Sequence, residues 1–223
     1  GPGFTFASWG LNFNRGNTWW ETGNRAWMEY LTRCNYLLRE GNPVADVLSF
    51  VGEDVPNRIA WRDELKPVLP RGYDFDGCDA KALMGARVRQ GRIDLPSGTE
   101  YRVLLLPDLK TMRPAVMKKI HDLVSAGAVV LGPKPSQSPS LRDLGKGDAA
   151  VRKLADDLWG TAAANGKLER SFDKGRVFSN VSFEYLFQSI NLSPDFEWRV
   201  DSPDAEVLYV HRRAGDTEIY FVS

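Results

Sequence analysis

A run of thirteen residues near the start of the chain, WGLNFNRGNTWWE at positions 9–21, concentrates side chains that can hold a sugar. The run contains three Trp, three Asn, one Arg and one Glu. The apolar face of a pyranose ring stacks on an indole, and its hydroxyl groups pair with planar amide and guanidinium groups. We therefore predict a sugar-binding site here. The candidate substrate contacts are Asn14, Arg15, Trp19, Trp20 and Glu21.

The same run contains a helix-capping pattern. Thr18 and Glu21 have the spacing of a capping box, in which two side chains satisfy the first N–H groups of a helix. Capping and substrate contact therefore both remain open for Glu21. Trp19 and Trp20 cannot both face one core, because neighbouring helical positions diverge by roughly 100°. At least one of the two is expected to face a pocket.

Acidic residues form a second group of candidate functional side chains. Paired carboxylates can do acid–base work on a glycosidic bond or bind Ca²⁺. In Tyr73-Asp74-Phe75-Asp76 the residue types alternate as in a strand, which places both Asp on one side. Glu53, Asp74 and Asp76 are therefore possible pocket carboxylates. The competing interpretation is that most of the acidic residues are solvated loop residues.

Composition restricts the class of partner. Among 223 residues, 29 Lys and Arg balance 29 Asp and Glu, so the formal net charge is zero. A phosphate backbone is held by an excess of basic charge, so nucleic acid is not an expected partner. No apolar run reaches the length of a membrane span, so no membrane association is expected. No signal peptide opens the chain, but if the N-terminus is a cut, the missing signal says nothing about the compartment. Two cysteines are too few for a disulfide framework, and Cys34 is predicted to be a buried thiol.

Residues 1–42 must position the sugar-binding run. Residues 11–14 are predicted to form a short strand, and residues 27–38 carry apolar side chains at helical spacing until Gly41-Asn42-Pro43 ends the helix. One strand and one helix cannot close a core, so we expect them to be the last unit of a (β/α)8 barrel. Asn14 to Trp20 would then lie at the C-terminal end of a barrel strand, where barrel enzymes bind their substrates.

Residues 43–200 are predicted to form an open α/β domain of the Rossmann or flavodoxin type. Apolar runs at 44–51, 101–106 and 128–131 are expected to be strands, and residues 114–126 are expected to be a helix. This βαβ unit implies parallel strands. Further helices are expected at 79–86, 149–159 and 182–190, and short strands with a turn within 87–98.

Phosphate-binding glycine motifs are missing from this α/β pattern. Neither G-x-G-x-x-G nor G-x-x-x-x-G-K-S/T follows any predicted strand. Those motifs bring backbone N–H groups close to a phosphate. We therefore expect no nucleotide or flavin cofactor.

Residues 201–223 are predicted to begin a β region. Val207–Arg212 and Thr217–Val222 flank a turn at Ala214-Gly215-Asp216, which is typical of a hairpin. The chain stops in strand-like sequence and begins with a binding loop, so both ends are expected to be cuts in a longer protein. The remainder of the same polypeptide is accordingly an expected partner.

Five segments, taken in order, resemble the family 106 glycoside hydrolases, which are α-L-rhamnosidases. These segments are WGLNFNRGNTWWE, AWMEYLTRCNYLLREGNPVADVLSFVGED, LPRGYDFDGCD, LPSGTEYRVLLLPDL and VHRRAGDTEIYFVS. The resemblance covers nearly the whole chain. It implies the end of a (β/α)8 catalytic barrel at 1–42, a glutamine-amidotransferase-like α/β domain at 43–200, and the start of a following β region at 201–223.

The resemblance also implies a chemistry. The family hydrolyses terminal α-L-rhamnosides with inversion and is associated with Ca²⁺, whose ligands cannot be assigned to residues here. Its catalytic Glu pair matches no motif in this chain and is expected upstream, so the isolated chain should be inactive. The implied partner is a rhamnose-containing oligo- or polysaccharide. A periplasmic or extracellular location is suspected for the full-length protein.

Cys78 is the residue to compare with amidotransferase chemistry. That chemistry needs a Cys on a sharp strand-to-helix turn with a His base in reach. His121 lies on the polar face of a predicted helix, and His211 alternates with apolar residues in a predicted strand. Neither is visibly paired with a Cys, so the α/β domain is expected to be catalytically inert.

Three functions remain open. The chain is a fragment of an α-L-rhamnosidase, or a non-catalytic α/β module with a structural or oligomerising role, or part of a β-galactosidase-like barrel glycosidase. The run from Asn14 to Trp20 favours the first over the third.

Overall fold

The computed structural model describes residues 23–55, 57–140, 145–160, 166–199 and 206–223. The chain divides into two compact units, residues 1–42 with 208–223, and residues 43–207. Asn14, Arg15, Trp19, Trp20 and Glu21 lie outside the described residues, so their predicted role stays a prediction. No helix in the described ranges is both long and apolar enough to cross a membrane.

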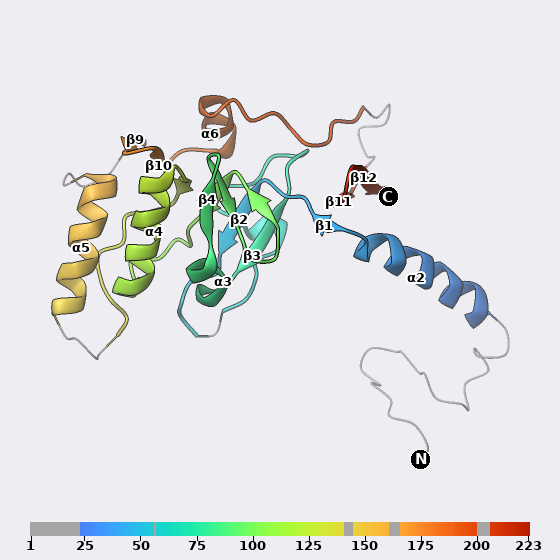
Figure 1. The fold of residues 1–223 in the computed structure, drawn as a ribbon, viewed down its shortest axis with the longest axis horizontal. Coiled ribbons are helices and arrows are strands. Elements are labelled where there is room, and N and C mark those ends of the chain that lie inside the picture. Colours follow the sequence, from blue (N-terminus) through green and yellow to red (C-terminus); the bar gives the residue numbers. More distant parts are fainter. Residues whose placement is uncertain (1–22, 56, 141–144, 161–165, 200–205) are drawn as a thin grey trace, which may run out of the picture. The chain divides into compact units, whose positions relative to one another are not determined.

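A six-stranded sheet forms the centre of the larger unit (Figure 1). Its strand order is β3-β2-β7-β8-β10-β9, and only β9 runs antiparallel to its neighbour. Numbered along the chain, the parallel strands follow the order 2-1-3-4-5, which is that of flavodoxin-like sheets. The strands are β2 (Val47–Phe50), β3 (Phe75–Cys78), β7 (Val103–Leu105), β8 (Val129–Leu131), β9 (Leu168–Phe172) and β10 (Gly175–Ser179).

The central strands are apolar on both faces because both faces are covered. Leu48 and Leu104 belong to one buried cluster, whereas the adjacent Val47 and Val103 belong to the other. Successive side chains of a strand point to opposite faces, so each strand contributes to both clusters. This is the pattern of a parallel sheet between two layers.

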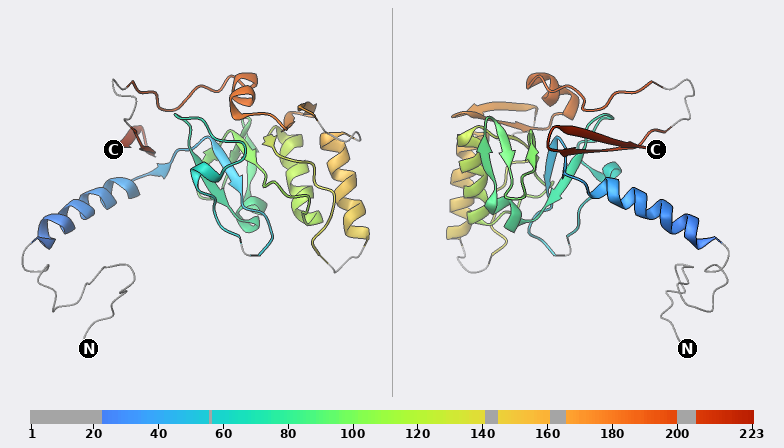
Figure 2. Two further views of the ribbon diagram at one scale, coloured as in Figure 1. Left: turned by 180° about the vertical axis from the view of Figure 1, so that it is seen from behind. Right: turned by 45° about the vertical axis from the view of Figure 1, so that its right-hand side comes forward.

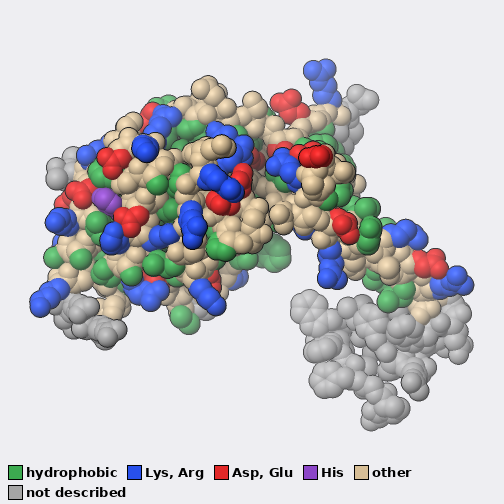
Figure 3. Space-filling view, viewed as in Figure 1, with side chains coloured by type: hydrophobic (Ala, Val, Ile, Leu, Met, Phe, Trp, Pro, Cys, Tyr) green, Lys and Arg blue, Asp and Glu red, His purple; other side chains and the backbone are tan. Residues whose placement is uncertain are grey.

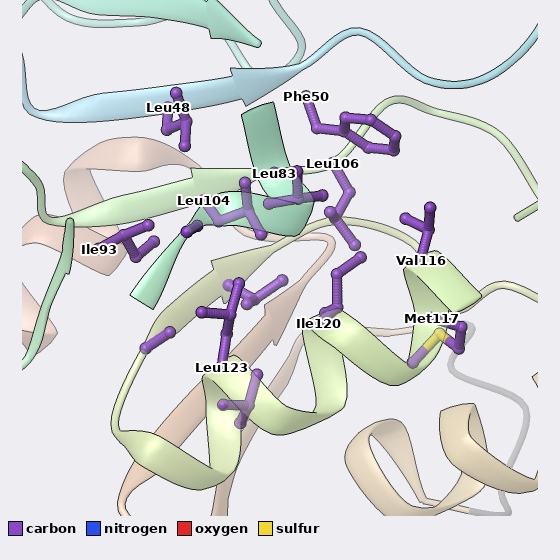
Figure 4. Packing of buried hydrophobic residues seen from close by; sticks show 14 of the residues in the cluster. Leu48, Phe50, Leu83, Ile93, Leu104, Leu106, Val116, Met117, Ile120 and Leu123 are labelled. Carbon is purple, nitrogen blue, oxygen red and sulfur yellow. The ribbon is translucent and has the colours of Figure 1, made fainter. Parts of the chain in front are cut away.

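Helices α3 (Ala80–Gly85), α4 (Pro114–Ala126) and α5 (Lys146–Trp159) contribute their buried residues to the cluster on the first face. Helices α4 and α5 lie side by side (Figure 2). Figure 4 shows Leu48, Leu104 and Leu106 turned toward Ile120 and the other apolar side chains of α4. The βαβ unit predicted from the periodicity of 114–126 is therefore confirmed as β7-α4-β8.

The second face is covered by α6 (Phe183–Ser189) and by the segment that follows β2. That segment contains the short 3-10 helix η2 (Arg62–Glu64) and brings Leu65 and Tyr73 into the cluster. Tyr73 stacks on Phe187 with 4.2 Å between ring centroids. A small antiparallel sheet in the same unit consists of β4 (Arg87–Arg89), β5 (Arg92–Asp94) and β6 (Glu100–Tyr101).

The smaller unit contains α2 (Asn24–Arg39) and a three-stranded sheet with the order β1-β11-β12. Its strands are β1 (Asn42–Pro43), β11 (Tyr209–Ala214) and β12 (Thr217–Val222), which confirms the predicted hairpin. Helix α2 has no buried residue, and Cys34 on its apolar stripe is only half-buried. The prediction of a buried Cys34 is therefore wrong for the described part of the chain, in which every residue of α2 stays at least partly exposed.

The mixed α/β architecture predicted from the sequence is confirmed, with one omission. The sequence interpretation contained no strand between 168 and 179, where β9 and β10 form a hairpin. Asp173 in its turn has a φ of 47°, a left-handed conformation that Asn and Asp adopt more readily than most residues. The barrel-end and amidotransferase-like assignments remain predictions.

Candidate functional site

The carboxyl ends of the parallel strands form the edge where open α/β sheets usually bind ligands. Gly52 and Glu53 follow β2 at this edge, and Asp79 follows β3. Together with Arg113 they line an open hollow of about 710 Å³. This edge is therefore the first place to look for chemistry in the described part of the chain.

Glu53 is not a solvated loop carboxylate. Its side chain is only 7% exposed, and one oxygen accepts a hydrogen bond from the backbone N–H of Arg113 at 2.8 Å. Its other oxygen pairs with the guanidinium of the same Arg113. Arg113 immediately precedes α4, so Glu53 satisfies an N–H group at the positive end of that helix. Both oxygens thus have structural partners.

Asp74 and Asp76 lie apart from Glu53. Asp74 directly precedes β3, at the amino edge of the sheet, and its carboxylate contacts Arg62 at 3.5 Å. Asp76 lies inside β3 and accepts a hydrogen bond from the Tyr101 hydroxyl at 2.9 Å. Burial raises the pKa of Asp74, and the charges of Asp76 and Asp195 add to this effect, whereas the N–H of Phe75 and Arg62 oppose it. The three predicted pocket carboxylates do not gather in one pocket.

Asp46, which the sequence interpretation did not single out, is an unusual carboxylate. It stands just before β2 and accepts a hydrogen bond from the N–H of Asp74 at 3.3 Å. Burial raises the pKa of Asp46 to about 6, and the charges of Asp195 and Asp74 contribute in the same direction. The available signal was an acidic residue inside the otherwise apolar run VADVLSFV.

Asp46 should make stability depend on pH. A carboxyl with a pKa of about 6 in the folded state, against roughly 3.9 when unfolded, binds its proton more tightly in the folded state. The free energy of unfolding should therefore fall by roughly 2–3 kcal/mol as the pH rises from about 4 to about 7. Asp46→Asn keeps an oxygen for the N–H of Asp74 and should remove this contribution.

Urea unfolding of the wild type and of Asp46→Asn between pH 4 and pH 8 measures the effect. The variant should be the more stable at pH 7, and its advantage should shrink toward pH 4. The control is Asp54→Asn, which changes an exposed carboxylate. A difference between wild type and Asp46→Asn that stays constant with pH would contradict the assignment.

Cys78 ends β3, and Asp79 caps the helix that follows by accepting the N–H of Ala82 at 2.8 Å. The position is thus a strand-to-helix turn, as amidotransferase chemistry requires. However, the thiol is buried, and burial raises the pKa of Cys78 to about 12, with a contribution from the charge of Asp79. A thiol that stays protonated is a poor nucleophile.

The two histidines have other partners. His121 faces Asp157 across a 3.4 Å contact and packs edge-on against Phe172, so it is less solvated than predicted. His211 is 2% exposed in its side chain, contacts Glu218 at 2.7 Å and stacks on Tyr220. No His–Cys pair is found within the described ranges. Catalytic inertness of the α/β domain stays a prediction.

No metal-binding cluster occurs in the described part of the chain. Nowhere in it do three or more His, Cys, Asp or Glu residues come together in a way that could hold an ion. The carboxylates that the sequence offered are satisfied by Arg113, Arg62 and Tyr101 instead. Ca²⁺ therefore has no residue assigned to it in the described ranges. Figure 3 shows positive and negative side chains interspersed over the larger unit.

A family model and a solved structure both relate this chain to rhamnosidases. The family model for α-L-rhamnosidases of glycoside hydrolase family 106 matches residues 1–223. The chain belongs to this rhamnosidase family. The solved structure of a rhamnosidase from Novosphingobium sp. PP1Y superposes with a TM-score of 0.78 at 30% identity, over 95% of this chain and 20% of that one.

A second relative carries a different name. A protein of Formosa agariphila described as "Putative beta-glucuronidase" is 37% identical over 223 residues, which is 100% of this chain and 18% of that protein. The rhamnosidase-family chain thus spans about a fifth of the length of the relatives that it matches.

Proposed function

We propose that this chain is part of an α-L-rhamnosidase that removes terminal α-L-rhamnose from an oligo- or polysaccharide. The observation that carries the proposal is the match of the rhamnosidase family model along all 223 residues. The likeness to a solved rhamnosidase over 95% of the chain supports it. Ca²⁺ and a periplasmic or extracellular location of the full-length protein belong to the same proposal.

The proposed reaction is hydrolysis with inversion. One carboxylic acid protonates the leaving oxygen, and a second carboxylate, about 6.5–9.5 Å away, activates a water on the opposite face of the sugar. Glu53, Asp74 and Asp76 do not form such a pair, since they have separate partners and lie at different places on the sheet. We therefore place the catalytic pair outside this chain, in the rest of the same polypeptide.

In this proposal the chain contributes to substrate binding. Residues 11–14 are taken as the last strand of the barrel, which puts Asn14 and Arg15 on its substrate-binding face. Trp19 or Trp20 would stack on the apolar face of the sugar, and Glu21 would accept hydrogen bonds from its hydroxyl groups. The α/β unit would serve as an accessory domain of the amidotransferase-like type.

A second candidate is a β-glucuronidase, which the name of the Formosa relative suggests. The two sugars differ in charge, because a glucuronide carries a carboxylate where rhamnose carries a methyl group. A glucuronidase must pair that carboxylate with a cation, and a bidentate Arg is the usual partner. Arg15 could pair with that carboxylate. Family membership alone therefore does not separate a rhamnosidase from a β-glucuronidase, and the substrate specificity has to be measured.

The full-length protein should hydrolyse 4-nitrophenyl α-L-rhamnoside much faster than the β-D-glucuronide or the β-D-galactoside. A pocket built for a methyl group leaves a carboxylate desolvated and unpaired, which costs several kcal/mol. Measurement of kcat/KM on the three substrates distinguishes the three candidate activities. Faster turnover of the glucuronide would support the second candidate, and faster turnover of the galactoside would point to a β-galactosidase-like enzyme.

Nucleotides should not bind to the α/β unit. The strand order is that of flavodoxin-like sheets, but no phosphate-binding glycine motif follows β2 or β7. Calorimetric titration of the chain with FMN, NAD and ATP should show no affinity tighter than about 1 mM, which is roughly 4 kcal/mol. Micromolar binding of any of the three would overturn this expectation.

A further inference from the structure

Two adjoining hollows lie at the carboxyl edge of the central sheet. One, of about 230 Å³, touches the ends of β7, β8 and β10, and the other, of about 180 Å³, touches the ends of β2 and β7. Lys66, Leu106 and Asp108 line both hollows. The two therefore form one crevice, which is bounded on one side by the segment that follows β2.

The topology of the sheet marks this crevice as a place for a ligand. The strand order reverses between β2 and β7, since β3 was added on one side of β2 and β7 on the other. At such a point the chain segments that follow the two neighbouring strands lead away in opposite directions along the sheet, which leaves an opening between them. Ligands of open α/β sheets bind in this opening, outside the carboxyl ends of the strands. The argument depends on the fold and not on any catalytic residue.

Among the polar side chains that line the crevice, those of Lys66, Asp108 and Ser179 make no hydrogen bond or ion pair with the described residues, whereas Asn180 donates a hydrogen bond to the carbonyl of Gly166. Ser179 at the end of β10 is 3% exposed as a residue, and its hydroxyl keeps some contact with solvent in the crevice. Lys66 and Asp108 are exposed, so their charged groups are solvated, and a ligand in the crevice would take the place of that water.

The apolar part of the lining is well defined. Leu106 and Leu131 are both buried at the ends of β7 and β8, and Pro133 and Val181 extend this apolar surface. Such a surface suits the C–H face of a small ring. Taken together, the two hollows fall at the lower end of the 300–1,000 Å³ that is usual for ligand pockets, so the occupant must be small.

The charges of the lining balance. The cation of Lys66 is offset by Asp108, and Arg58 is already bound to Glu64, with a 2.7 Å hydrogen bond from its guanidinium to the carboxylate. A ligand with a net charge would therefore find no excess of the opposite sign. A hydroxyl group both donates and accepts, so a neutral polyol can satisfy Lys66, Asp108 and Ser179 together.

We propose that this crevice binds a neutral, hydroxyl-rich ring of monosaccharide size. Lys66 donates to ligand hydroxyls, Asp108 accepts from them, and the hydroxyl of Ser179 pairs with one of them above the apolar surface of Leu106 and Leu131. The proposal assigns a binding site to the α/β unit that the proposed rhamnosidase reaction does not use. It does not require rhamnosidase activity, so the two proposals fail separately.

The test uses the ¹⁵N-labelled chain, with L-rhamnose as the probe and glycine, inorganic phosphate and FMN as probes of other charge and size. L-Rhamnose should shift the backbone amides of Leu106, Gly132 and Asn180 with a millimolar Kd. Lys66→Ala, Asp108→Ala and Ser179→Ala should each weaken binding about tenfold. The matched controls are Lys153→Ala and Asp54→Ala, which change exposed residues outside the crevice lining and should leave the Kd unchanged.

The three crevice variants keep the apolar lining, so folding should be preserved, and dispersed amide spectra verify this. If the isolated chain does not give such a spectrum, crystals of the full-length protein soaked in L-rhamnose answer the same question. Absence of the sugar from the crevice, or shifts that the three variants do not reduce, would overturn the proposal. Preferential binding of glycine, phosphate or FMN there would refute the neutral-sugar assignment.

Discussion

Residues 1–223 alone should release no nitrophenol from 4-nitrophenyl α-L-rhamnoside, whereas the full-length protein should hydrolyse it. Inverting hydrolysis needs an acid and a base, and each such group typically contributes 10²–10⁴-fold to the rate. A chain without either group should therefore be slower by at least about 10⁴-fold, which places turnover below detection. The measurement is nitrophenol release at equal molar concentrations of the two proteins.

Variants of the carboxylates in this chain complete that experiment. In the full-length protein, Asp76→Asn and Glu53→Gln should leave the chemical step intact, because these residues hold Tyr101 and Arg113. A cooperative melting transition of residues 1–223 should accompany the assay, so that inactivity is not due to unfolding. Turnover by the chain alone, abolished by either substitution, would show that the catalytic pair lies within it.

Local patterns predicted the helices well because each helix satisfies its own backbone. Helix α4 was expected at 114–126 and is found at those residues, with the apolar face that its 3.6-residue period requires. Asp79 and Ser182 were both expected to begin helices, and both accept a backbone N–H as N-caps. These features depend on residues within a few positions of one another.

Features that depend on long-range pairing were not predictable in the same way. Glu53 meets Arg113 sixty residues further along the chain, and this contact follows only from the strand order. Strand β10 escaped notice because Arg176-Val177-Phe178-Ser179 is short and follows a polar turn, although it runs beside β8 inside the sheet. Ser179 was therefore missed as well. The pKa of Asp46 is likewise a product of burial, which no spacing reveals.

The predicted sugar contacts rest on residues outside the described ranges, so mutation is their direct test. In the full-length enzyme, Arg15→Ala should lower rhamnosidase kcat/KM about tenfold to a hundredfold. A charge-assisted hydrogen bond to a sugar hydroxyl contributes about 1.5–3 kcal/mol, and its loss appears in the transition state. The matched control is Arg87→Ala, which removes an exposed guanidinium on β4 and should leave the kinetics unchanged.

Trp20→Ala should also lower kcat/KM if its indole stacks on the sugar, whereas Trp61→Ala, which removes an indole that is 71% exposed in the α/β unit, should not. Melting must be followed in parallel, because loss of a core Trp costs roughly 3–5 kcal/mol of stability. A large fall in melting temperature with unchanged kinetics would make Trp20 a core residue. Unchanged kinetics and unchanged melting for Arg15→Ala would remove Arg15 from the substrate contacts, and the sugar-binding interpretation of residues 9–21 would lose its charged anchor.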